Sequence, residues 1–358
     1  MGRNSRNLIK EYYIAYMDIL GYRVFFKQHS REILDFLDEI DNAIKHTKSH
    51  VQVTNDSPIL KNVGNIDIKS KIFSDNILLC METSDNPFEP IRILSFLQIV
   101  SDIQRGFVTD YGLFLRGGIK KGYIAINDNY VFGQGLIDAV EMEEKNAKYP
   151  RIIIDEDIVK KLFAIIYTKE EIEKVTTIEN TLKNDQTVSR EDMDYYNKIT
   201  SHVIMNNLLL YASKNLIWQW DDGQYFVNYL HQRINPTDFL GNNYVDALKT
   251  KLKTISPYDF ELINQPLPEQ DLYLMQNKRR IEEQLQTYGH VFDNEIEDWE
   301  KAVLQEETRE HVLRKYIWAM AYHNRFCVLT NKLDFFIDTE CNCDTRYLKM
   351  ILKVISKE

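Results

Sequence analysis

Two aspartates, Asp18 and Asp75, lie within or near the end of apolar runs, where an ionised side chain needs a specific reason to be. Asp75 stands at the centre of KIFSDNILLC (71–80), and Asp18 lies near the end of YYIAYMDIL (12–20). Moving an ionised carboxylate out of water without a compensating partner costs several kcal/mol or more. We therefore expect each acid at a turn, in an ion pair or beside a bound metal ion.

Together, the two carboxylates predict a site for divalent cations. If their strands are neighbours in one sheet, the acids reach the same edge, and like charges that close stay ionised only with cations between them. Mg²⁺ commonly takes one or two carboxylates and leaves positions open for phosphate oxygens. Two such ions about 3.5–4 Å apart stabilise an in-line displacement at phosphorus. From spacing alone, the alternative stays open that Asp18 caps a turn and Asp75 is an ordinary turn residue.

Neighbouring residues favour the interpretation as a cation and phosphate site. The segment DILGY (18–22) predicts a tight turn whose backbone N–H groups can hold phosphate oxygens. Lys71 lies four residues before Asp75, near the same edge. The glycines of RGGIKKG (116–122) leave room for the close approach of another element or of a substrate.

Hydrophobic periodicity predicts the elements that must position these residues. Runs typical of strands cover 12–20, 65–73, 76–81, 113–126 and 151–155. Helical spacing covers 31–48, 88–108 and about 135–148. Only Ser74 and Asp75 separate the second and third strands, which predicts a hairpin with Asp75 at its tip.

The order β-α-β-β-α-β-β-α-β predicts an α+β fold, a ferredoxin-like mixed sheet with extra strands and with helices on one face. Residues 155–203 have a charged, helical pattern, and a hairpin within 215–230, turning at Asp221 and Asp222, is expected to complete the sheet. From about residue 240 the pattern is helical. We therefore expect a first domain at 1–235 and a C-terminal helical module at 236–358.

Composition limits the classes of function. The chain has 358 residues, 44% of them apolar, and its net charge of −10 argues against a broad nucleic-acid-binding face. Because neither a signal peptide nor an apolar run of membrane-spanning length is found, we expect a cytosolic protein without membrane contact.

Other reactive residue types give weaker signals. Eight scattered histidines assemble no Ser-His-Asp, Cys-His or zinc set, which weighs against hydrolases, and His323 is expected in a helix core. The pair Cys341 and Cys343 lacks the usual zinc spacing.

Four segments, MDILGY, KIFSDNILLC, LRGGIKKGYI and VFGQGLIDAVEMEEKNA, occur in the order and rough spacing typical of the class III nucleotidyl cyclases. The chain resembles that family over about residues 10–155, with the hairpin up to residue 230 as an extension. Within the family it is most similar to the bacterial pyrimidine cyclases of the Pycsar type, which share the GG-I-x-x-G strand and carry an added C-terminal region.

The resemblance implies a role for each matching residue. Asp18 and Asp75 would be the catalytic, metal-binding aspartates for two divalent ions, Mg²⁺ or Mn²⁺, with the backbone carbonyl of Ile19 as a further ligand. The backbone N–H groups of Gly21 and Tyr22 would bind the β- and γ-phosphates.

Substrate contacts also follow from the resemblance. Lys71 matches the position that contacts the base, and Arg116 is a candidate for binding phosphate.

One family feature is missing. The helix after Gly133 normally carries an asparagine and, four residues later, an arginine that stabilise the transition state, and Ile137 and Glu141 occupy these positions here. Arg116, Lys120, Lys121 or a partner chain would then have to supply the positive charge, or the activity would be weak or lost. The acidic residues of this helix, Asp138, Glu141, Glu143 and Glu144, are expected on an exposed face.

The implied activity is that of a nucleotide cyclase, a phosphorus–oxygen lyase. It would convert a nucleoside triphosphate, preferably CTP or UTP, into a 3′,5′-cyclic mononucleotide and pyrophosphate, in anti-phage signalling. A single cyclase domain implies a head-to-tail homodimer, with the base contacted partly by the second chain. Two alternatives stay open, a weak or inactive cyclase-like sensor that binds nucleotide or a partner, and a purine cyclase in which Lys71 contacts adenine.

Overall fold

The computed structural model describes residues 9–22, 38, 41–42, 45, 66–85, 89–162, 169–184, 187–196, 215–231, 268–289 and 306–338. The helix expected at 31–48 falls largely outside these residues, and Cys341 and Cys343 fall wholly outside them. The two other cysteines, Cys80 and Cys327, are buried free thiols.

The described residues form an eight-stranded mixed sheet in the order β2-β3-β1-β4-β6-β8-β7, with β5 paired to β4. Its strands are β1 (Lys10–Leu20), β2 (Ile68–Phe73), β3 (Asn76–Glu82), β4 (Phe114–Ile126), β5 (Val131–Phe132), β6 (Ile152–Ile154), β7 (Ile217–Gln219) and β8 (Tyr225–Val227). The pair of β4 and β6 is parallel, and the other pairs are antiparallel. The α+β class and the mixed sheet are as expected, and β1 lies between β3 and β4.

The hairpin that carries Asp75 is confirmed. Strands β2 and β3 pair up to Phe73 and Asn76, so Ser74 and Asp75 alone make the connection. Ser74 has a φ of 58°, in the left-handed region that two-residue hairpin turns favour. The polar pair therefore interrupts the apolar run because the chain reverses there.

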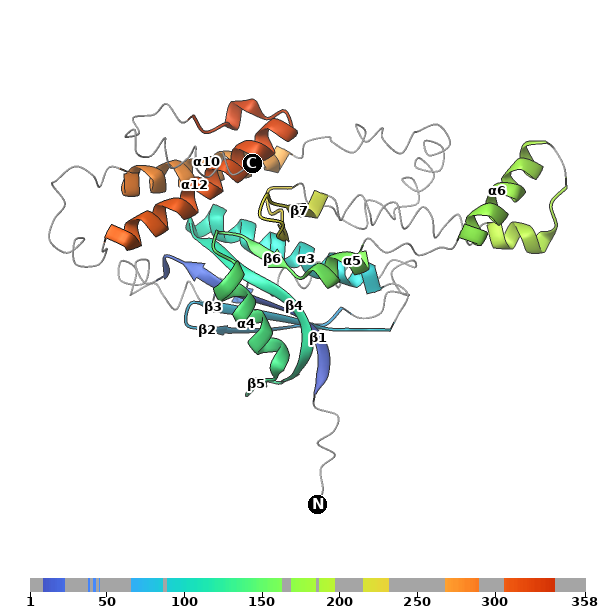
Figure 1. Cartoon of the computed structure of the whole chain (residues 1–358), viewed down its shortest axis with the longest axis horizontal. Helices are drawn as coiled ribbons and strands as arrows, with labels where there is room; N and C mark the ends of the chain where they lie inside the picture. The colour runs from blue at the N-terminus through green and yellow to red at the C-terminus, as the bar shows by residue number, and fades with distance from the viewer. Residues whose placement is uncertain are drawn as a thin grey trace, which may run out of the picture.

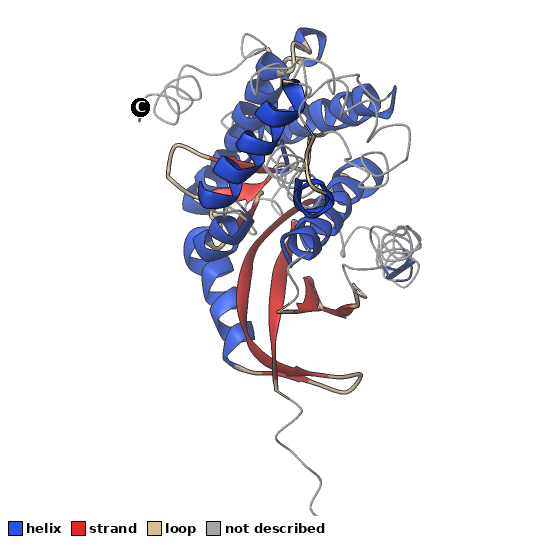
Figure 2. Ribbon diagram, turned by 90° about the vertical axis from the view of Figure 1, so that its right-hand side faces the viewer, coloured by secondary structure: helices blue, strands red, loops and turns tan. Residues whose placement is uncertain are grey.

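Helices cover both faces of the sheet (Figures 1 and 2). The helices α3 (Glu89–Gly106) and α5 (Glu156–Leu162) share one core cluster with Tyr13, Ala15 and Met17 of β1. The alternate residues Tyr12 and Ile14 face the helix α4 (Gln134–Asn146). The expectation that the helices cover one face of the sheet thus holds for α3 and α5. Helix α4 packs on the opposite face, because β1 is apolar on both sides.

Glycines of β4 allow α4 to lie close to the sheet. A Cβ atom at Gly122 would lie 2.6 Å from the Cα atom of Gly135, and one at Gly118 would lie 3.0 Å from the side chain of Met142. The close approach expected for the RGGIKKG segment is therefore made by a helix of the same chain at these two positions.

The C-terminal helices α10 (Pro268–Gly289) and α12 (Glu306–Leu329) share a hydrophobic cluster with the sheet. Trp318 of α12 is 1% exposed, stacks on Tyr149 with ring centroids 5.6 Å apart, and meets Phe226 of β8 edge-on. His323, as expected, is a buried core residue, hydrogen-bonded to Asn277. These contacts place the C-terminal helices directly on β4, β6 and β8 (Figure 1).

The hairpin of β7 and β8 has the expected turn, and ion pairs anchor it. Asp222 pairs with Arg151, whose side chain is 1% exposed, and Asp221 pairs with Arg325 of α12 at 3.2 Å. The two turn aspartates thus have structural partners in addition to their place in the turn.

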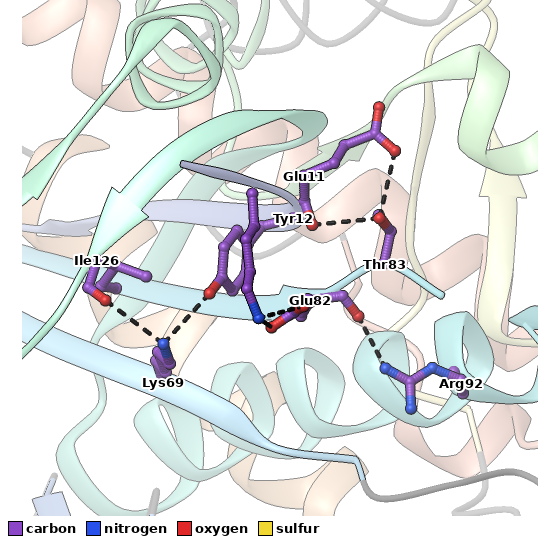
Figure 3. A network of polar contacts seen from close by, with 8 residues as sticks. Glu11, Tyr12, Lys69, Glu82, Thr83, Arg92 and Ile126 are labelled. Carbon is purple, nitrogen blue, oxygen red and sulfur yellow. Dashed lines mark hydrogen bonds and ion pairs between the residues drawn. The ribbon is translucent and has the colours of Figure 1, made fainter. Parts of the chain in front are cut away.

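Polar contacts close the end of the sheet remote from Asp18 (Figure 3). Lys69 donates to the Tyr12 hydroxyl at 3.2 Å, and Arg92 of α3 donates to the Glu82 carbonyl at 2.8 Å. Thr83 donates to the Glu11 carbonyl at 3.2 Å. These bonds fix the register of β1, β2 and β3. The positions of Asp18 and Asp75 at the opposite end of the sheet depend on that register.

The remaining described helical segments agree with the charged pattern of 155–203, and include α6 (Lys169–Lys183). Among the described residues, no helix combines the length and the apolar composition that a membrane span needs.

Candidate active site

The structure brings the backbones of Asp18 and Asp75 together. Asp18 is opposite Asn76 in the ladder of β1 and β3, and the Ile19 N–H donates to the Asp75 carbonyl at 2.8 Å. The hairpin tip therefore lies beside the end of β1. The negative charge of Asp75 also helps to raise the pKa of Asp18.

Asp18 is a partly desolvated acid. Burial raises the pKa of Asp18, Arg116 opposes that effect, and Asp75 adds to it. Its side chain is 19% exposed. A carboxylate that is costly to ionise and lies beside a second carboxylate is stabilised by an added cation.

Among the residues that the structure describes, Arg116 forms an ion pair with Asp18. The two residues are opposite each other in the ladder of β1 and β4, and the Nε atom of Arg116 lies 3.1 Å from Asp18 Oδ2. The same Nε atom lies 2.6 Å from Oε1 of Glu143. Arg116 thus bridges two carboxylates, one from β1 and one from α4, and the phosphate contact expected of it stays a prediction.

The expectation that Glu143 lies on an exposed helix face is wrong. Gly135, Ala139 and Glu143 recur every four residues and form the buried side of α4, and Glu143 is 4% exposed. Burial raises the pKa of Glu143 from 4.5 to about 7, against the lowering effect of Arg116. The small residues at the same helical spacing were the signal in the sequence that this side faces the sheet.

Glu143 should make stability depend on pH. Because its pKa is raised from 4.5 to about 7 in the folded protein, ionisation opposes folding, and this cost grows as the pH rises from 4.5 to beyond 7. Relative to the wild type, Glu143→Gln should therefore gain stability between pH 5 and pH 8, by up to about 3 kcal/mol. Urea unfolding at both pH values measures the difference, with exposed Glu144→Gln as the control. A difference between Glu143→Gln and wild type that is the same at both pH values would contradict this prediction.

Lys71 lies on the same face of the sheet as Asp18. Lys71 is opposite Leu78, which is opposite Tyr16, two residues before Asp18 on β1. Its ammonium donates to the Asp128 carbonyl at 2.5 Å, in the connection between β4 and β5. A ligand that reached from Asp18 to Lys71 would therefore extend from β1 across β3 to β2.

Two aromatic residues that the sequence reasoning missed lie on this path. The rings of Tyr16 and Phe73 are 6.3 Å apart, and Phe73 is 40% exposed. The pKa of Tyr16 is raised to about 12, chiefly by burial. The negative charges of Glu143, Asp18 and Asp75 raise it further. In the register of the sheet, Tyr16 is level with Lys71, and Phe73 is level with Asp18. The alternation of residues 16 and 18 along β1 was the available signal.

The turn after β1 is present as expected. Gly21 has a φ of 82° and is exposed, which allows the chain to turn immediately after the strand. Tyr22 packs against the hydrophobic core. The phosphate contacts expected of their backbone N–H groups, and the ligand role of the Ile19 carbonyl, stay predictions.

Lys120 and Lys121 do not reach the aspartates. Lys120 pairs with Asp155, and Lys121 pairs with Glu11 at 2.9 Å. On β4, Lys120 is four residues beyond Arg116, which corresponds to about 13 Å along a strand. Arg116 is therefore the member of the expected basic set that lies at the site.

Ile137 and Glu141, at the positions where the class III cyclase helix carries an asparagine and an arginine, point away from Asp18. Ile137 is 49% exposed, and Glu141 pairs with Lys145 at 2.7 Å. Glu141 lines a polar groove of about 540 Å³ between α4, β6 and the turn of β7 and β8. Within one chain this groove is separate from the aspartates, because α4 lies between them.

The donor set suits a hard divalent ion that completes its coordination with water and phosphate. Among the described residues, no group of three or more His, Cys, Asp and Glu side chains could hold a metal ion. Two carboxylates fit Mg²⁺ or Mn²⁺ at a phosphate site, which commonly needs no larger protein cage. The residues that would hold the ions are Asp18 and Asp75.

Comparisons with known proteins give only distant matches. No protein-family model matches the chain, and no curated protein matches its sequence. The chain is similar to the adenylyl cyclase CyaB of P. aeruginosa, with a TM-score of 0.31, 16% identity, and coverage of 42% of this chain and 80% of that chain. A bacterial light-regulated adenylyl cyclase gives a TM-score of 0.29 at 13% identity, with 43% and 79% covered.

A third similar structure is a class III adenylyl cyclase-like ATP-binding protein from Pseudomonas aeruginosa, with a TM-score of 0.28, 12% identity, and 45% and 39% covered. TM-scores and identities of this size establish neither the family nor the activity of this chain.

Proposed function

We propose that the chain is a nucleotidyl cyclase acting on a nucleoside triphosphate, preferably CTP or UTP. The main support is that Asp18 and Asp75 lie next to each other at one end of the sheet. The hydrogen bond from the Ile19 N–H to the Asp75 carbonyl holds the hairpin tip beside the end of β1. The four sequence segments similar to class III cyclases also support it. A protein that only stabilised its fold would have no need for two neighbouring acids at this position.

The residues of the chain fit the cyclisation of a triphosphate. Asp18 and Asp75 would hold two divalent ions, which when bound neutralise phosphate charge and activate the ribose 3′-hydroxyl. The 3′-oxygen bonds to the α-phosphorus, the bond from that phosphorus to the β-phosphate oxygen breaks, and the hydroxyl proton passes to solvent. Arg116 keeps its contact with Glu143, so it can exchange Asp18 for a phosphate oxygen without losing its orientation.

Base recognition would use the same face of the sheet. Tyr16 and Phe73 offer aromatic surface, and Lys71 offers a cationic donor beyond them. An ammonium can donate to the O2 of cytosine or to either carbonyl of uracil. The same group can bind a ring nitrogen of adenine, so a purine cyclase is the alternative substrate class.

The site would be completed by a second copy of the chain, arranged head to tail. Exposed apolar side chains occur on β4, β5 and α4, with Tyr123 60%, Phe132 72% and Ile137 49% exposed. Covering such side chains favours association. The biological role we propose for the cyclic product is signalling in phage defence.

A second candidate function is a sensor that binds nucleotide without turnover. The observation in its favour is that α4 presents Ile137 and Glu141 where the cyclase helix carries an asparagine and an arginine. Glu141 pairs with Lys145 rather than offering a positive charge.

The test incubates the protein separately with ATP, GTP, CTP and UTP, in Mn²⁺ and in Mg²⁺, and identifies products by mass spectrometry. We expect a cyclic pyrimidine nucleotide from wild type and at most a trace from Asp75→Asn. Cyclic AMP as the main product would identify a purine cyclase. Absence of any cyclic product, with retained nucleotide binding, would favour the sensor.

A further inference from the structure

The C-terminal helix α12 brings a lysine to the carboxylate cluster. Tyr316 of α12 packs edge-on against Phe114 of β4, with ring centroids 5.8 Å apart. Phe114 is two residues before Arg116 and therefore lies on the same face of the strand. The preceding helix residue, Lys315, lies near enough to this cluster for the charges of Asp18, Glu143 and Arg116 to act on the pKa of its ammonium.

Without a bound ligand, the positive charge of Lys315 is unfavourable at its position. Burial and then the charge of Arg116 lower the pKa of its ammonium, whereas Asp18 and Glu143 raise it. Among the residues that the structure describes, the Lys315 ammonium makes no direct ion pair, while Arg116 contacts both nearby carboxylates. A partly buried ammonium beside a second cation needs a negative partner that the described side chains do not supply directly.

The charge requirement of the proposed reaction identifies that partner. A triphosphate together with two divalent ions brings several anionic oxygens to Asp18 and Asp75. Among the described residues, the cations at this place are Arg116 from β4 and Lys315 from α12, since Lys120 and Lys121 pair elsewhere and α4 has Ile137 and Glu141. A lysine on a flexible stem can follow phosphate oxygens as they separate from the nucleotide.

We propose, on the basis of the proposed function, that Lys315 binds the phosphate oxygens that become pyrophosphate, so that the C-terminal helices complete the active site of their own chain. Lys315 is then a substrate-binding residue in place of the arginine that α4 lacks. The C-terminal helices are required for turnover for this reason, apart from any role in sensing a signal.

The experiment measures binding of inorganic pyrophosphate in the presence of Mn²⁺ by calorimetry, which does not depend on turnover. Lys315→Met should weaken pyrophosphate binding about 10- to 100-fold, the usual loss for a charge-assisted hydrogen bond. Lys315→Arg should restore part of the affinity. Arg325→Met, which removes a cation from the same helix where it pairs with Asp221, should bind as wild type does.

A second measurement separates a phosphate contact from a structural effect. Binding of cytidine, which has no phosphate, should be unchanged in Lys315→Met, and the urea midpoint of this variant should equal or exceed that of wild type, because a partly buried charge is removed. Equal pyrophosphate affinity in Lys315→Met and wild type would overturn the inference while leaving the cyclase proposal intact. Failure of wild type both to bind pyrophosphate and to convert any triphosphate would overturn the cyclase proposal and this inference with it.

Discussion

Asp18→Asn is expected to lose turnover by roughly 10²–10⁴-fold, the range for removing an interaction with a catalytic metal ion worth several kcal/mol. The fold should survive, because burial raises the pKa of Asp18 and its ionised form is therefore a cost to the folded state. Asparagine keeps the shape and one hydrogen-bond acceptor for Arg116. Activity should thus fall steeply while the free energy of unfolding stays the same or rises.

Turnover and urea unfolding of the same preparation test both parts of this prediction. Asp157→Asn is the matched control, since that carboxylate lies on α5 with 84% of its side chain exposed. An Asp18→Asn protein as active as wild type would show that Asp18 serves only to pair Arg116. A clear loss of stability would show that the ion pair with Arg116 outweighs the desolvation of the acid.

The sequence was sufficient to predict the strands and the placing of the two aspartates, because both depend on local patterns. The continuous apolar run of β1 is typical of a strand buried on both faces. The two polar residues Ser74 and Asp75 between apolar segments leave a hairpin as the simplest connection. Once β1 and β3 are neighbours, the end of one and the tip of the other must meet, as the Ile19 N–H bond to Asp75 confirms.

Which residues surround Arg116 depends on tertiary contacts that no local pattern encodes. Glu143 lies in a run of acidic residues and was expected in solvent, but the close approach of Gly122 and Gly135 turns its side of α4 toward the sheet. Lys315 comes from a helix about 200 residues further along the chain. Only the packing of α12 on Phe114 brings it to the same cluster.

The division of the chain into 1–235 and 236–358 rests on the change of sequence pattern alone, and Trp318→Ala tests it. Trp318 is 1% exposed and is packed by Tyr149 and Phe226 on one side of that division and by Tyr322 of its own helix on the other. Truncating a buried tryptophan leaves a cavity and costs about 3–5 kcal/mol. Because the lost contacts belong to both parts, we expect one unfolding transition, shifted to lower urea as a whole.

Far-UV circular dichroism follows the helices and the sheet together during urea unfolding. Leu329→Ala, on the same helix but 65% exposed, should change stability by less than about 0.5 kcal/mol. Two separate transitions, with only one shifted in Trp318→Ala, would show that the C-terminal helices unfold as a module of their own. A single shifted transition would mean that α12 is part of the folding unit of the sheet, which is also what a lysine held firmly beside Asp18 requires.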